Sequence, residues 1–220
     1  MRALTRGDAP ECLGHTPKNA KWGDFDPKCK KEVLDELRSM AVGTEGPFCH
    51  YCESLLKQGQ NRYSIDHMYP RHRYPARTFD WSNLYLSCKT AAHCDQFKDA
   101  KGCPPYEPED LLRPDVDEPD SFLQFLSSGE VIPREGLTPS DQHRAETTIR
   151  VLALNATDLQ ARRQQTALIA KSYVDEVLEI EGWEESELQE LLAGMIAEAE
   201  REMAGLAYSS VARHYFMYFQ

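Results

Sequence analysis

Two pairs of cysteines constrain this chain more than any other feature. Cys49 and Cys52 have the C-x2-C spacing that places two thiolates on one tetrahedral ion, and Cys88 and Cys94 follow after a gap of 35 residues. Chance clustering of reduced core thiols is the alternative, but four of the seven cysteines fall in this one stretch. The pattern predicts a structural zinc site with four sulfur ligands, for which His50 and His93 are alternative ligands.

The other three cysteines, Cys12, Cys29 and Cys103, have no ligand spacing. Residues 1–25 lack the apolar core of a signal peptide, and no apolar run approaches the roughly 20 residues that cross a bilayer. We therefore expect a soluble, cytoplasmic protein without a membrane partner. Since such a compartment is reducing, the three cysteines are expected to be free or core thiols.

Charge is distributed unevenly along the chain. The net charge of −11 argues against a nucleic-acid partner, but residues 1–100 carry 15 basic against 13 acidic side chains, and the remainder carries 10 against 23. Residues 62–77 hold four arginines and two histidines against one carboxylate, that of Asp66. The sequence thus predicts a modest positive patch beside Asp66 and an acidic C-terminal half.

Periodicity in the first hundred residues predicts a helix followed by a strand, loop, strand and helix. The first helix begins at Asp26-Pro27 and ends near Gly43, with Trp22 and Phe25 anchored on the core before it. A short helical turn is expected at 53–57, strands at 62–66 and 83–88, a proline-containing loop at 69–75, and a helix opening at Asp95.

The second half reads as mostly helical. Five prolines at 103–120 predict a connector, and a hairpin follows at 122–132. Helices are expected at 140–154, 157–180 and 184–206, with Leu168, Ile169 and Val174 in the core. The aromatic tail at 208–219 either folds back or docks on another chain. We therefore predict an α+β, predominantly helical fold with a cysteine-bearing core (1–102), a connector with a hairpin (103–137) and a helical region (138–220).

A closed four-thiolate zinc has no open position, so it cannot activate water. Asp66, however, offers a hard carboxylate for Mg²⁺ or Mn²⁺, and the adjacent His67 points the opposite way at a strand end. An imidazole is suited to take a proton from water near neutral pH. An Asp-His pair alone is more often a surface feature, but Asn83 and Asp95 downstream strengthen the indication of a reactive site.

The order of these motifs resembles that of the HNH (ββα-metal) endonucleases that carry a zinc knuckle. The matching segments are C-x2-C, Asp66-His67, WSNL at 81–84, and the final cysteines with Asp95-x-x-Lys98. The finer pattern, DHMYPR at 66–71 and DWSNLYLSC at 80–88, is similar to the PtuB-type HNH nucleases of Septu and retron-associated anti-phage systems.

This resemblance implies a small ββα-metal core that cleaves DNA and works with an ATPase subunit, PtuA. It makes His67 the general base, Asn83 the residue that holds the loop bearing His67, and Asp66 and Asp95 the ligands of the catalytic Mg²⁺ or Mn²⁺. Asp95 stands where the family has His or Asn, which makes His93 its rival. The implied phosphate contacts are Arg71, Arg73 and Lys98. A non-catalytic zinc-knuckle binding module and an RNA-directed nuclease remain the alternatives.

Overall fold

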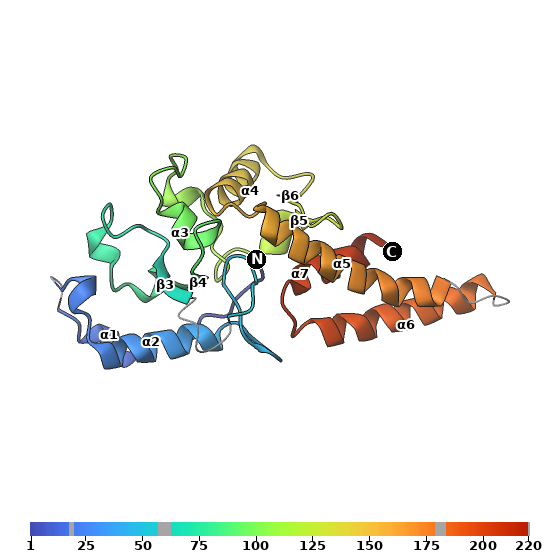
Figure 1. Ribbon diagram of the computed structural model, residues 1–220, viewed down its shortest axis with the longest axis horizontal. Coiled ribbons are helices and arrows are strands. Elements are labelled where there is room, and N and C mark those ends of the chain that lie inside the picture. The colour runs from blue at the N-terminus through green and yellow to red at the C-terminus, as the bar shows by residue number, and fades with distance from the viewer. Residues whose placement is uncertain (18–19, 57–62, 179–183, 220) are drawn as a thin grey trace.

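The computed structural model describes residues 1–17, 20–56, 63–178 and 184–219. Figure 1 shows an elongated molecule with the N-terminal helices at one end and the C-terminal helices at the other. The strands form small antiparallel sheets between them. The fold is α+β and mostly helical, as the sequence predicted.

A two-stranded sheet followed by a short helix lies at the centre of the N-terminal half. Strands β3 (Tyr63–His67) and β4 (Leu84–Cys88) pair antiparallel, and helix α3 (Cys94–Lys98) follows. The predicted order of strand, loop, strand and helix is confirmed; Arg62, the predicted first residue of the strand, lies outside the described residues. In this register Ser64 faces Ser87 across the pair. Side chains alternate along a strand, so Ser64 and Asp66 share one face and His67 belongs to the other.

The N-terminal segment holds the short helix α1 (Glu11–Gly14), a 3-10 turn (Trp22–Asp24) and helix α2 (Pro27–Ser39). The Asp26 side chain caps α2 by accepting from the Cys29 N–H at 2.8 Å, and Pro27 follows it. The expectation that Cys12 and Cys29 are free thiols is wrong. They form a disulfide, because α1 brings their Cα atoms to 5.7 Å.

The predicted helical turn at 53–57 is wrong for its described residues. Leu55 instead forms a bridge with Phe48, next to the small hairpin of β1 (Val42–Gly43) and β2 (Gly46–Pro47). Glu53 adopts φ 65°, a left-handed conformation that turns its N–H onto the Cys49 carbonyl at 3.0 Å. This turn closes the loop between the first two cysteines. Lys57 lies outside the described residues.

The connector contains 3-10 turns at Pro108–Asp110 and Pro119–Ser121, followed by the predicted hairpin of β5 (Leu123–Phe125) and β6 (Val131–Pro133). Helix α4 (Pro139–Val151) begins at Thr138, whose hydroxyl accepts from the Asp141 N–H at 3.2 Å. The hydrophobic core extends without interruption from α2 through the β3–β4 sheet and this hairpin to α4 and the start of α5. The connector therefore packs on the same core as the sheet.

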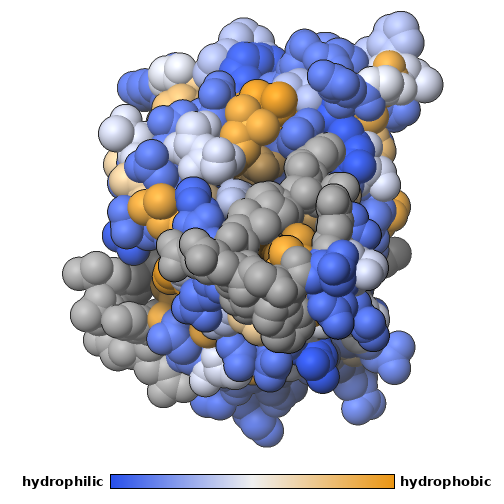
Figure 2. All heavy atoms as spheres, turned by 90° about the vertical axis from the view of Figure 1, so that its right-hand side faces the viewer, coloured by the Kyte–Doolittle hydropathy of each residue, from blue (hydrophilic) through white to orange (hydrophobic). Residues whose placement is uncertain are grey.

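Three helices form the C-terminal end: α5 (Thr157–Leu178), α6 (Glu185–Met203) and α7 (Ser209–Phe219). The aromatic tail folds back as α7, since Phe216 is fully buried against α5 and α6. Leu168 and Ile169 are not in the core as expected; they are 53% and 50% exposed, while Val174 is buried. Figure 2 views this end and shows hydrophobic patches separated by hydrophilic surface. Among the described residues, no helix has the length and apolarity to cross a bilayer.

Candidate active site and metal centre

The four predicted zinc ligands lie together and are buried. One ligand atom from each of Cys49, Cys52, Cys88 and Cys94 lies within 4.8 Å of all the others. The Cys49 and Cys94 sulfurs are 3.8 Å apart, and those of Cys52 and Cys88 are 3.7 Å apart. A tetrahedral ion with Zn–S bonds of about 2.3 Å requires sulfurs about 3.8 Å apart. The cluster therefore fits a structural zinc ion.

Both histidines named as alternative ligands have other contacts. The His50 ring donates from Nε2 to the Leu37 carbonyl at 2.9 Å and accepts at Nδ1 from the Leu86 N–H at 3.2 Å. Burial lowers the pKa of His50 to about 3, so its ring is neutral. His93 Nδ1 lies 3.2 Å from the Cys94 sulfur, and its Nε2 lies 3.3 Å from Asp158 on α5. His93 thus lies beside the sulfur cluster, and its described hydrogen bonds do not include Asp66.

The knuckle is connected directly to Asp66. Tyr51, between the first two cysteines, donates its hydroxyl to Asp66 Oδ2 at 2.6 Å. Burial, together with the charge of Asp66, raises the pKa of Tyr51 well above its usual value, so the phenol stays protonated and can donate. Asp66 itself is only 3% exposed. Closing the zinc site therefore places a hydrogen-bond donor on the carboxylate that the sequence proposes as a metal ligand.

Asp95 lies at the start of α3, over the face of the sheet that carries Ser64. It accepts from the Ser64 hydroxyl at 2.6 Å and from the Ser87 hydroxyl at 3.0 Å. Burial raises the pKa of Asp95, and the charge of Asp66 raises it further. Carboxylate oxygens are preferred ligands of Mg²⁺, which is commonly bound by one or two carboxylates with water. The donor set fits such an ion, although only the cysteines form a group of three or more metal-ligand residues in the described chain.

His67 ends β3 with its ring in a defined tautomer. Because a carbonyl can only accept, the 3.0 Å contact with the Thr78 oxygen requires the proton to be on Nε2. Nδ1 then keeps its lone pair. The indole of Trp22 packs edge to face on the ring at 4.5 Å between centroids. Burial lowers the pKa of His67 to about 4, against the opposing effect of Asp66, so the ring is unprotonated at neutral pH and able to accept a proton.

Asn83 holds both ends of the loop that follows His67. Its Oδ1 accepts from the Tyr69 N–H at 2.7 Å, and its Nδ2 donates to the carbonyls of Tyr69 at 3.2 Å and Arg77 at 2.9 Å. The Met68 N–H adds a bond to the Asn83 carbonyl at 3.1 Å. These are the backbone contacts that the family resemblance implies for this residue. Its importance for catalysis stays a prediction.

One curated relative has a name that bears on this site. Over 141 residues the chain is 26% identical to a Vibrio cholerae protein named "Retron Vc95 putative HNH endonuclease", a match that covers 62% of this chain and 63% of that protein. The likeness supports a relation to the HNH endonucleases. No family model matches the chain.

The predicted phosphate contacts have different surroundings. Arg71 is exposed, whereas Arg73 is paired with Glu107. Lys98 is buried, and its ammonium lies 3.3 Å from Asp66 Oδ1, 2.6 Å from Asp99 and 3.2 Å from the His67 carbonyl. Burial lowers the pKa of Lys98, but the charges of Asp66 and Asp99 outweigh this and raise it above its usual value. Lys98 is therefore an internal counter-ion of Asp66 and does not offer its charge to a phosphate at the surface.

Sequence reasoning missed several residues of the site. The sequence did offer a sign of the role of Tyr51. This residue lies between Cys49 and Cys52, so its position is set when the two cysteines bind the metal. Ser64 and Ser87 could have been paired by assuming that the two strands are antiparallel and in register. Trp22 gave no signal of its contact with His67, because 44 residues separate the two in the sequence.

Replacing Asn83 with aspartate is expected to destabilise the protein by about 2–3 kcal/mol, because a carboxylate cannot donate to the Tyr69 and Arg77 carbonyls and is buried beside them. Chemical denaturation measures this change in unfolding free energy. Ser82→Ala, on an exposed neighbour, serves as the control and should change it by less than about 0.5 kcal/mol. An equal effect of the two substitutions would contradict the role of Asn83 in holding the loop.

Proposed function

We propose that this protein is a metal-dependent HNH endonuclease that hydrolyses phosphodiester bonds of DNA. The observation that carries the proposal is the unprotonated Nδ1 of His67, fixed by the bond from Nε2–H to Thr78 at the end of the strand that also bears Asp66. This is the arrangement that a general base requires, because the accepting atom is oriented and the ring is neutral at working pH.

The reaction assigned to these residues is an in-line hydrolysis. Nδ1 of His67 takes a proton from water, the oxygen forms a bond to phosphorus, and the bond to the 3′ oxygen breaks. Asp66 and Asp95 would hold Mg²⁺ or Mn²⁺, which would supply electrostatic stabilisation of the negative charge on the phosphate oxygens and on the leaving 3′ oxygen. Tyr51 and Lys98 hold the Asp66 carboxylate in place, and Asn83 holds the loop that follows His67.

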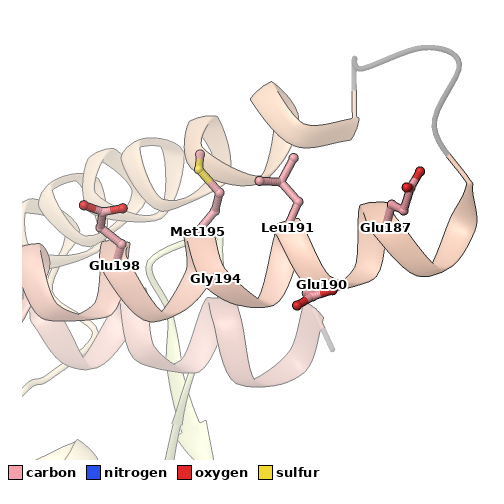
Figure 3. A pocket seen from close by; sticks show the side chains of 6 residues that line it. All are labelled: Glu187, Glu190, Leu191, Gly194, Met195 and Glu198. Carbon is pink, nitrogen blue, oxygen red and sulfur yellow. The ribbon is translucent and has the colours of Figure 1, made fainter.

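We further propose that the nuclease is the effector of an anti-phage complex that contains a PtuA-like ATPase subunit. The word retron in the name of the Vibrio relative and the PtuB-like motifs support this assignment. A hollow of about 500 Å³ on α6 suits a basic and apolar segment of such a partner. Leu191 and Met195 lie along one side of the helix there, with Glu187 and Glu198 beyond them at either end (Figure 3).

A cleavage assay tests the proposed function. Purified protein, with and without the co-purified ATPase subunit, is incubated with plasmid DNA, single-stranded DNA and RNA in the presence or absence of Mg²⁺ or Mn²⁺. The ion is omitted by desalting rather than by chelation, because a chelator would also remove zinc from the cysteines. We expect cleavage of DNA only when Mg²⁺ or Mn²⁺ is added.

Two other outcomes identify the alternatives. Protein that keeps one zinc per chain but cleaves no substrate, even with its partner, is a zinc-knuckle binding module. One observation favours the binding module: both carboxylate oxygens of Asp66 and both of Asp95 already contact other groups of the protein. Cleavage of RNA but not DNA makes it an RNA-directed nuclease.

A further inference from the structure

A hollow of about 380 Å³ opens beside the candidate base, on the side of His67 that Trp22 covers. We call it the Trp22 pocket; its lining includes Lys21, Trp22, Arg71, Pro75, Ala76 and Thr78. Two of these residues touch His67 directly: Trp22 packs on its ring, and the Thr78 carbonyl accepts its Nε2 proton. The Trp22 pocket therefore adjoins His67 through these two residues.

The chemistry of the pocket combines an aromatic ring with positive charge. Lys21 and Arg71 are exposed, and none of the described lining residues is acidic, although the chain as a whole carries a net charge of −11. Lys30 adds a third cation 5.1 Å from the indole centroid. Pro75 and Ala76 supply an apolar wall. Cations beside an aromatic platform are the usual means by which proteins bind single-stranded nucleic acid.

Trp22 is half-buried, and the Arg71 guanidinium lies over its ring, with the guanidinium carbon 5.7 Å from the indole centroid. Because the Arg71 side chain is exposed, a base that stacks on the indole can displace it. Phe25 and Phe79 pack on the indole from the core side at 5.0 and 5.8 Å and hold the ring in place. A platform fixed in this way loses little conformational freedom when a base stacks on it.

We propose that the Trp22 pocket binds one unpaired nucleotide next to the scissile phosphate, with its base against Trp22 and its phosphates near Lys21 and Arg71. This inference rests on the proposed nuclease function and narrows its substrate. A base reaches an aromatic platform only after leaving the duplex stack, so the favoured substrate is single-stranded or locally opened DNA.

Binding is tested without cleavage, in protein that carries His67→Ala. The probes are a 12-nucleotide oligo(dT) and the same strand paired with oligo(dA), titrated while tryptophan fluorescence is followed. We expect the single strand to quench the fluorescence of Trp22 and the additional substitution Trp22→Leu to weaken its binding about tenfold, with Trp22→Phe in between. Duplex binding should change less than twofold. Lys28→Ala, an exposed cation outside the pocket, is the matched control and should leave both affinities unchanged.

The outcomes separate this inference from the proposed function. If the Trp22 variants bind the single strand as tightly as the His67→Ala protein that keeps Trp22, the proposed nucleotide site is wrong. This holds whether or not the enzyme cleaves DNA. Quenching that depends on Trp22 in a protein that never cleaves DNA supports the nucleotide site and rejects the nuclease assignment. If a Trp22→Leu variant with His67 intact cleaves DNA faster, Trp22 shields the imidazole of His67 from the substrate. The proposed nucleotide site is then wrong as well.

Discussion

Replacing His67 with alanine is expected to lower the rate of DNA cleavage by about 10²- to 10⁴-fold, the usual contribution of a general base. The loss follows from the removal of Nδ1, the atom to which the proposed reaction assigns the proton of the attacking water. Single-turnover nicking of plasmid DNA in Mg²⁺ measures the effect. Zinc content should not change, because the described contacts of the His67 ring do not include the cysteines.

A second substitution separates loss of chemistry from loss of structure. His67→Gln keeps most of the side-chain volume and a donor for the Thr78 carbonyl, but it lacks a basic ring nitrogen. It should fold like the parent protein and be nearly as inactive as the alanine variant. His143→Ala, on an exposed histidine of α4, is the control and should cleave normally. Undiminished cleavage by either His67 variant would refute the assignment of the base.

Local patterns were sufficient to predict most elements of the fold. The sequence around Asp26-Pro27 contained both the cap and the first residue of α2, and the alternation at 62–66 predicted the strand observed as β3 at 63–67. The cysteine spacing predicted the sulfur cluster because a tetrahedral ion accepts only a narrow range of geometries. In each case the information lay within a few residues or in the coordination chemistry of one ion.

Contacts between distant segments were not predictable in the same way. Cys12 and Cys29 were expected to be reduced from an argument about cellular compartment, but their pairing depends on how α1 packs beside α2. The family resemblance implied a phosphate contact for Lys98, since its motif gave only the residue type. Its burial against Asp66 follows from the packing of α3 on the sheet. Leu168 and Ile169 fitted an apolar stripe, yet no described helix covers them.

Cys52→Ser is expected to cause the largest loss of stability in this protein. Structural zinc contributes about 10–16 kcal/mol to the folding of small zinc-finger peptides, and we expect a loss on the order of 5 kcal/mol here, since the larger core does not depend on the metal. Atomic absorption should find one zinc per chain in the parent protein and little in the variant. Thermal unfolding followed by circular dichroism measures the difference.

The same substitution should also reduce cleavage in protein that is still folded at low temperature. Cys52 closes the loop that aims Tyr51 at Asp66, and Cys94 begins the helix that presents Asp95 and Lys98. Loss of zinc should therefore displace contacts to both candidate ligands of the catalytic ion. Cys103→Ser is the matched control, because that thiol lies outside the sulfur cluster and should affect neither zinc content nor activity. Full activity in zinc-free protein would show that the knuckle does not position the reactive residues.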